Sequence, residues 1–259
     1  MIAADIEYNE SGEGQTIVFL HGIGGNLDSF TTQMAGLKNF RSIALNLPGY
    51  GQSSRGKWPP SFESLSARLS DFIKALQLGS VHLVGHSIGG MLAIEHSVRD
   101  PKQVRSLSLI GTTPSFGGRD QSFREQFLKA RLAPLDAGQS MAEMASHAVP
   151  HLLGPDAKRD VIVKVQSQLA SVTEETWRSI LQCLVTFNRR DDLDKITAPC
   201  CVIAGNCDQN APAKTMEKMA DNLPNAQFHV LEDVGHMINQ EAPGVVNAIL
   251  EDFLGELQK

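Results

Sequence analysis

The chain has 259 residues, of which 42% are hydrophobic and 20% charged, and its formal net charge is −6. This composition is that of a globular protein with a buried core, and it excludes global disorder. The negative balance argues against a nucleic-acid partner, because such proteins neutralise phosphates with Lys and Arg. No apolar run approaches the ~18–20 residues that span a bilayer, so no membrane partner is expected.

The cysteines and the N-terminus point to a cytoplasmic localisation. The first residues are polar and acidic, unlike a secretory signal peptide. The four cysteines show no disulfide-framework spacing and no zinc-type pair, which favours a reducing compartment. Cys200 and Cys201 are adjacent on a predicted strand and should point to opposite faces of the sheet.

The first half of the chain alternates strand and helix patterns. Its strand patterns are short and continuously apolar, as in strands covered on both faces. Its helical patterns repeat apolar residues at the spacing of one helix face. This alternation is typical of a parallel α/β sheet. The predicted strands cover residues 16–20, 42–47, 81–85 and 104–111, and the predicted helices cover residues 62–76 and 88–98.

The alternation stops between residues 113 and 190, where four helical patterns occur without a strand. It resumes with a strand at 198–205, a helix from about Pro212, a strand that leads to His236, and a last helix through 245–253. The predicted breakers between the four helical patterns are Pro134, Gly138, Pro150 and Gly154-Pro155. We therefore predict an α/β core, residues 1–112 and 191–259, with an all-helical lid inserted at residues 113–190.

The insertion differs from the core in charge. It holds ten Lys and Arg against eight Asp and Glu, whereas the rest of the chain holds 13 against 21. A positive lid on an acidic core favours an anionic substrate at their junction. Arg119, Arg124 and Arg131 are candidates to bind the anionic group, and a solvated helix face is the alternative for each.

Gly85-His86-Ser87-Ile88-Gly89 is a G-x-S-x-G sequence that follows a predicted strand and opens a predicted helix. This context is that of a nucleophile elbow, which exposes a serine hydroxyl at a sharp strand-to-helix turn. An ordinary glycine-rich turn is the alternative. Ser87 is therefore the candidate nucleophile.

A serine nucleophile needs a base, and the base needs a carboxylate that holds its tautomer. His236 follows the last predicted strand, so it should lie at the carboxyl end of the sheet beside Ser87. Asp208 follows the preceding strand, and capping of the next helix is its alternative role. Glu232 and Asp233 are competing acids. The order Ser87, Asp208, His236 matches that of α/β hydrolases.

The remaining candidate residues surround this triad. The backbone N–H groups of Ile23 and Ile88 are the predicted oxyanion-hole donors. Gly22, Phe116, Trp177 and Met237 are predicted to line the substrate pocket, with core packing as the alternative for Trp177. His147 and His151 have a zinc-like spacing but lack a third ligand, so no metal site is predicted. No cofactor is expected.

Five motifs in order resemble the α/β-hydrolase superfamily: HGIGG from His21, LNLPGYGQS from Leu45, GHSIGG from Gly85, GNCD from Gly205 and GH from Gly235. The chain is most similar to 3-oxoadipate enol-lactonases, haloperoxidase-like esterases and meta-cleavage-product hydrolases. The resemblance implies an α/β-hydrolase fold whose first strand would precede residue 1 and be short or missing.

The resemblance implies a serine hydrolase that cleaves a small ester, enol-lactone or related carbonyl compound through an acyl-enzyme. Met237 stands where C–C hydrolases of the meta-cleavage type commonly carry Trp, and Asn46 stands where the family often has Asp. A C–C hydrolase and a ligand receptor on the same fold are the alternatives. The sequence gives no indication of an oligomeric state.

Overall fold

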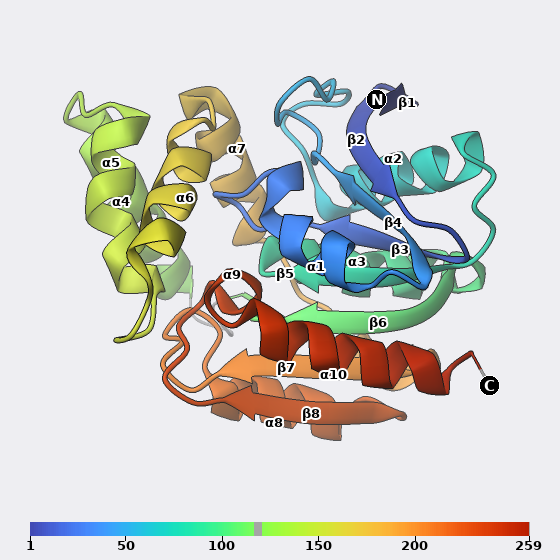
Figure 1. The fold of residues 1–259 in the computed structure, drawn as a ribbon. Helices are drawn as coiled ribbons and strands as arrows, with labels where there is room; N and C mark the ends of the chain where they lie inside the picture. Colours follow the sequence, from blue (N-terminus) through green and yellow to red (C-terminus); the bar gives the residue numbers. More distant parts are fainter. Residues whose placement is uncertain (117–120, 259) are drawn as a thin grey trace.

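A mixed sheet forms the centre of the protein in the computed structural model, which describes residues 1–116 and 121–258 (Figure 1). Within these residues the strand order is β1-β2-β4-β3-β5-β6-β7-β8. Strands β3 to β8 pair in parallel, whereas β1 and β2 join the β4 edge in antiparallel fashion. The strands are β1 (Ile2–Ala3), β2 (Ile6–Ser11), β3 (Gln15–Leu20), β4 (Phe40–Leu45), β5 (Val81–His86), β6 (Val104–Ile110), β7 (Cys200–Gly205) and β8 (Ala226–Leu231).

Helices cover both faces of the sheet and divide the core into two clusters. One cluster joins the sheet to α2, α3 and α8, and the other joins it to α1, α9 and α10. Cys200 belongs to the first cluster and Cys201 to the second, so their side chains point to opposite faces as predicted. These helical elements are η1 (Leu27–Phe30), α1 (Thr31–Gly36), α2 (Phe62–Ala75), α3 (Ile88–Arg99), η2 (Pro101–Gln103), α8 (Ala213–Asp221), α9 (Ile238–Glu241) and α10 (Pro243–Glu256).

Among the described residues, four helices and two 3-10 turns connect β6 to β7, and the four helices lie at the end of the sheet to which β6, β7 and β8 point (Figure 1). Pro134 was predicted to separate two helices but lies inside α4. The helix ends two residues later, so only its last turn accommodates the proline, which has no N–H to donate. These elements are α4 (Gln121–Asp136), α5 (Met141–Ala148), η3 (Val149–Leu152), α6 (Arg159–Ala170) and α7 (Glu174–Leu184), and η4 (Arg190–Lys195) then leads back to the core.

The helical insertion begins and ends at one point of the core. Ser115 and Asn188 form an antiparallel β-bridge, the Phe116 N–H donates to the Phe187 carbonyl, and the Arg189 N–H donates to the Pro114 carbonyl. We call this paired segment, residues 114–116 and 187–189, the root of the insertion.

The predicted α/β-hydrolase fold, with a mostly parallel sheet flanked by helices, is confirmed. The sequence did not indicate β2, in which only Ile6 and Tyr8 are buried between polar neighbours. The expected first strand is short, as β1, and lies within the chain. No helix in the described ranges is long and apolar enough to cross a membrane.

Candidate active site

Ser87 occupies a sharp turn between β5 and α3. Its backbone has a φ of 54°, which side-chain-bearing residues rarely adopt. A Cβ on Gly89 would lie 2.1 Å from the Leu20 carbonyl oxygen, and one on Gly85 would lie 2.4 Å from the Gly89 oxygen. Glycine is therefore required at both positions, because α3 packs directly against neighbouring backbone. The turn places the Ser87 hydroxyl at the carboxyl end of the sheet.

His236 lies between Ser87 and Asp208. Its Nε2 atom is 3.1 Å from the Ser87 Oγ, and its Nδ1 atom is 2.7 Å from the Asp208 Oδ2. A carboxylate only accepts hydrogen bonds, so Nδ1 carries the proton and Nε2 is free to accept the serine proton. The structure thus brings the three predicted residues together in hydrogen-bonding order.

Asp208 is buried, yet its surroundings favour the charged carboxylate. Burial acts to raise its pKa, but the electrostatic interaction with His236 and the hydrogen bonds from His236 and two backbone N–H groups hold it below the usual value. Those N–H groups belong to Asn210 and Ala211 and donate to Oδ1. The alternative helix-cap role is absent, because Pro212 occupies the cap position of α8.

The competing acids do not contact the His236 ring. Glu232 is exposed and accepts a hydrogen bond from Asn206, and Asp233 is exposed in a turn with a φ of 58°. The carboxylate that bonds the Nδ1 atom of His236 is therefore that of Asp208.

The loop after β3 is fixed by buried hydrogen bonds. His21 contacts the Gly22 carbonyl through Nδ1 and accepts from the Leu47 N–H through Nε2. Burial lowers the pKa of His21 to about 4, so it is neutral and structural rather than a base. Tyr50 donates to the Ile23 carbonyl and packs edge-on against His21. The loop that carries the predicted Ile23 donor is therefore rigidly held beside the cavity.

The first residue of α3, Ile88, is fully buried beside Ser87. Its N–H belongs to the first turn of the helix, where backbone donors lack partners within the helix. The Ile23 and Ile88 donors follow adjacent strands, β3 and β5, at the same sheet edge. Their role as an oxyanion hole stays a prediction.

Three residues that the sequence analysis did not single out hold the His236 loop. His86 bonds the His236 carbonyl through Nε2 at 2.8 Å, and burial lowers the His86 pKa to about 3. Glu241 accepts from the backbone N–H groups on both sides of His236, at Gly235 and Met237. The carbonyl of Leu152, in the insertion, accepts from the His236 N–H at 2.6 Å.

Glu241 also joins the His236 loop to the insertion. Its Oε2 atom accepts from the Gly154 N–H at 2.6 Å, in addition to the two bonds in the loop. Burial raises the pKa of Glu241, and the three backbone hydrogen bonds oppose this rise. The Glu241 carboxylate therefore links the His236 loop to the insertion, in addition to the bond from the His236 N–H to the Leu152 carbonyl.

A cavity of about 650 Å³ lies at Ser87 between the core and the insertion, a size typical of small-molecule sites. All four predicted pocket residues line it: Gly22, Phe116, Trp177 and Met237. Trp177 is also buried in the packing of α7, so its core-packing role applies as well. The core contributes further lining residues from the loops after β3, β5, β6 and β7, and the insertion contributes mainly apolar side chains from α4, α6 and α7.

The candidate anion-binding residues differ in position. Arg131 lines the cavity, Arg124 is absent from its lining, and Arg119 lies outside the described residues. Arg190 lines the cavity too, and the sequence analysis did not select it. His147 and His151 are exposed. Within residues 1–116 and 121–258, no group of three or more His, Cys, Asp or Glu side chains is placed to hold a metal ion.

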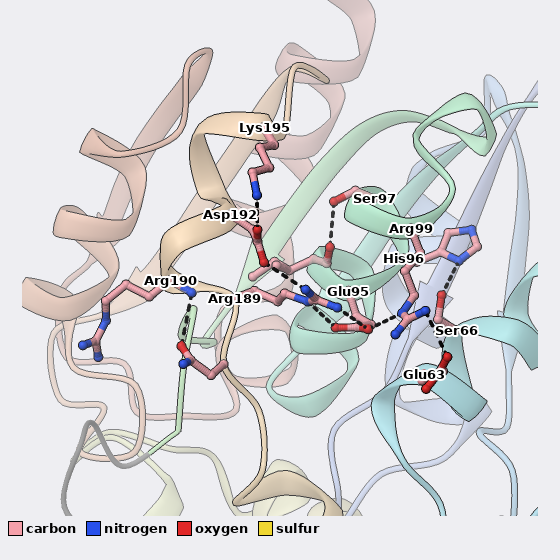
Figure 2. Close-up of polar contacts among 12 residues, drawn as sticks. Glu63, Ser66, Glu95, His96, Ser97, Arg99, Arg189, Arg190, Asp192 and Lys195 are labelled. Carbon is pink, nitrogen blue, oxygen red and sulfur yellow. Dashed lines mark hydrogen bonds and ion pairs between the residues drawn. The ribbon is translucent and has the colours of Figure 1, made fainter.

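An ion-pair cluster centred on the buried Glu95 includes Arg189, at the root of the insertion (Figure 2). Glu95 on α3 is buried, and Arg189 donates to both of its carboxylate oxygens at 2.7 and 2.8 Å. Arg99 and Asp192 extend the cluster by pairing with Glu95 and Arg189, respectively. The cluster joins the end of the insertion to α3, the helix that follows Ser87.

This fold and this site define a hydrolase, and comparison with known proteins identifies its family. The model of the alpha/beta hydrolase fold family matches residues 15–243. The chain belongs to that family, as the sequence motifs predicted.

Individual relatives are distant. An acetyltransferase component of the acetoin-cleaving system of Pseudomonas putida is 29% identical over 249 residues, which are 94% of this chain. The chain spans only 64% of that relative's length. A thermophilic esterase from Thermogutta terrifontis has a TM-score of 0.89 at 22% identity, covering 98% of this chain and 94% of the esterase. The enol-lactonase of Burkholderia xenovorans has a TM-score of 0.88 at 21% identity, covering 96% of each chain.

Proposed function

We propose that this protein is a serine hydrolase that cleaves a small-molecule ester or lactone through an acyl-enzyme. The observation that carries the proposal is the continuous hydrogen-bond chain from the Ser87 hydroxyl through His236 to Asp208. Ser87 and His236 line a cavity that is large enough for a small substrate. Esterases and an enol-lactonase share the fold, which agrees with this chemistry.

In the first half of the reaction, the Ser87 oxygen attacks the carbonyl carbon while His236 Nε2 takes its proton. Asp208 stabilises the imidazolium and keeps its orientation. The N–H groups of Ile23 and Ile88 bind the negative oxygen of the tetrahedral intermediate. His236 then gives its proton to the leaving oxygen, and the Ser87 acyl-enzyme forms.

In the second half, water attacks the acyl-enzyme and His236 takes a proton from it. The second tetrahedral intermediate collapses, Ser87 regains its proton, and the acid leaves. No cofactor takes part in these steps. The insertion, residues 113–190, acts as the lid that encloses the substrate over the core, residues 1–112 and 191–259. Its mild positive charge predicts an anionic substrate.

The test is hydrolysis of 4-nitrophenyl butyrate by the wild type and Ser87→Ala. We expect kcat/KM to fall about 10⁴- to 10⁶-fold, because removal of the nucleophile removes the acyl-enzyme route. Ser146→Ala is the matched control, since Ser146 is exposed on α5 and does not line the cavity. Unchanged hydrolysis in Ser87→Ala would refute the assignment.

The two alternative functions, a C–C hydrolase and a ligand receptor, are tested by assaying the wild type on esters, lactones and a vinylogous 1,5-diketone. Bleaching of a vinylogous 1,5-diketone without ester or lactone turnover would identify a C–C hydrolase. Tight ligand binding without turnover on any of these substrates would identify a receptor.

We also propose that the protein acts in the cytoplasm. The four cysteines are free thiols, three of them buried, as expected for a protein in a reducing compartment.

A further inference from the structure

The charged side chains that line the cavity are of one sign. Among the described residues, Arg131 and Arg190 line it and no Asp or Glu does. The remainder of the wall is apolar or neutral apart from the histidines beside Ser87. A cavity that collects cations without acids is electrostatically suited to an anion.

Arg131 reaches the cavity from α4 and is half-buried. Its guanidinium lies over the Phe127 ring, 5.3 Å from the centroid, and Nη2 donates to the Asn210 side chain at 3.1 Å. Both partners are neutral. Burial lowers the pKa of Arg131, and no described carboxylate offsets this effect. The protein therefore holds a cation at the cavity without neutralising it.

Arg190 contrasts with the residue before it in the chain. Arg189 is neutralised by Glu95 and Asp192, whereas the Arg190 guanidinium points away from that cluster (Figure 2). Its Nη2 donates to the neutral Ser115 hydroxyl at 2.7 Å, at the root of the insertion. The Arg189 ion pairs fix the backbone from which Arg190 projects.

The partners of the two arginines lie on neighbouring parts of the core. Ser115 follows β6 and Asn210 follows β7, and these strands pair in parallel. Both guanidiniums are therefore bonded to loops that follow neighbouring strands. Ser87 follows β5, the next strand along the sheet, and lines the same cavity as the two arginines.

We propose that Arg131 and Arg190 bind a carboxylate of the substrate, so that the substrate is an ester or lactone that also carries a free carboxylate. This inference rests on the proposed hydrolase function. A guanidinium presents paired N–H donors that match the two oxygens of a carboxylate, and a second guanidinium adds charge and fixes orientation. The apolar wall then holds the carbon chain between that carboxylate and the carbonyl at Ser87.

The experiment compares two esters that differ in one charge, mono-4-nitrophenyl glutarate and 4-nitrophenyl pentanoate. The variants are Arg131→Gln, Arg190→Gln and the double variant. Arg159→Gln removes one positive charge from an exposed site of α6 outside the cavity and is the matched control.

We expect the wild type to prefer the anionic ester in kcat/KM. Each single substitution should lower that preference about tenfold, and the double substitution about 100-fold, through KM for the anionic ester. Hydrolysis of the pentanoate ester should change little, which also reports that the variants are folded. Arg159→Gln should keep the wild-type preference. An equal preference in the wild type and the double variant would overturn the proposal.

A binding measurement separates this inference from the proposed function. Glutarate is titrated calorimetrically into Ser87→Ala and into Ser87→Ala with both arginine substitutions. Loss of glutarate binding on substitution of the arginines supports the carboxylate site, even where no ester is hydrolysed. Equal binding by the two proteins overturns it, even where esters are hydrolysed.

Discussion

The two walls of the cavity are built differently. On the core side, Ser87, Gly22 and the His236 loop are positioned by backbone geometry and buried hydrogen bonds. On the insertion side, the wall consists mainly of side chains from helices α4, α6 and α7. Under the proposed function, the core wall would perform the chemistry and the insertion wall would select the substrate, and the predictions below test this division.

The spatial tolerance of the two walls differs in the same way. A Cβ on Gly22 would lie 2.8 Å from the His86 ring, and one on Gly89 would strike backbone, so the core wall has no room for variation. The insertion wall is formed instead by side chains such as Phe127 on α4, Leu169 on α6 and Leu181 on α7. Backbone clashes cannot relax by a rotamer change, whereas helix side chains can be exchanged at constant fold.

The largest effect is expected on the core wall, from His236→Ala. Removal of the base should lower kcat about 10⁴- to 10⁶-fold, with a small change in KM, because the base acts only in the chemical steps. Steady-state kinetics on 4-nitrophenyl butyrate measure this. The exposed His147→Ala serves as control. A loss confined to KM would place His236 outside the chemistry.

The second effect tests the root that joins the two walls. Glu95→Gln removes the buried carboxylate that pairs with Arg189, which keeps only Asp192, and should cost about 3 kcal/mol of unfolding free energy at pH 7. Burial acts to raise the pKa of Glu95, but the bonds from Arg189 and Arg99 hold it below the usual value. The stabilisation is therefore present above the unfolded-state pKa and lost as pH falls through the lower folded-state pKa.

Urea unfolding of the wild type and Glu95→Gln over pH 3 to 7 measures this dependence. The difference in unfolding free energy should be largest at pH 7 and shrink in acid. Glu63→Gln, which removes an exposed partner of Arg99, should cost less than 1 kcal/mol, as about 0–1 kcal/mol is typical of surface pairs. A pH-independent difference would contradict the ionic origin of the effect.

A smaller effect is expected from Glu241→Gln, which weakens the link between the His236 loop and the insertion. We expect kcat to fall about 10- to 100-fold with KM nearly unchanged, because a misplaced imidazole affects the proton transfers and not the binding. Glu251→Gln, on the exposed side of α10, is the control. A change in KM alone would assign Glu241 to substrate binding instead.

The smallest effect is expected on the insertion wall, from Phe116→Leu. This substitution should change the preferred acyl-chain length of 4-nitrophenyl esters by about 3- to 10-fold in kcat/KM, because it alters only apolar contact in the cavity. A series from acetate to decanoate measures the shift. An equal decrease for every chain length would show that Phe116 supports the catalytic geometry, and would weaken the division between the two walls.

The fold and the triad were predictable because their signals are local. Ser87, Asp208 and His236 each follow a strand pattern, and the ends of parallel strands meet at one edge. The strand β2 was missed because its two buried residues alternate with polar ones over only six positions. Pro134 was read as a break because the sequence does not show where in the helix it falls.

The residues that support the site were harder to find. Glu241 lies near the start of the last helices, where an acid is ordinary, and its three backbone partners are known only from the tertiary structure. Arg190 belongs to a run of two arginines and two aspartates that is typical of a solvated turn. Only packing separates Arg189, which is neutralised, from Arg190, which lines the cavity.

The bridge between Ser115 and Asn188 has an evolutionary and practical consequence. Because the chain leaves and re-enters the core at one paired position, the two ends of the inserted segment lie side by side. A different helical segment could replace it without displacing β6 or β7, provided that it supplies the bonds that Leu152 and Gly154 make to the His236 loop and to Glu241. Chimaeras that keep these two residues are therefore the natural starting point for redesign.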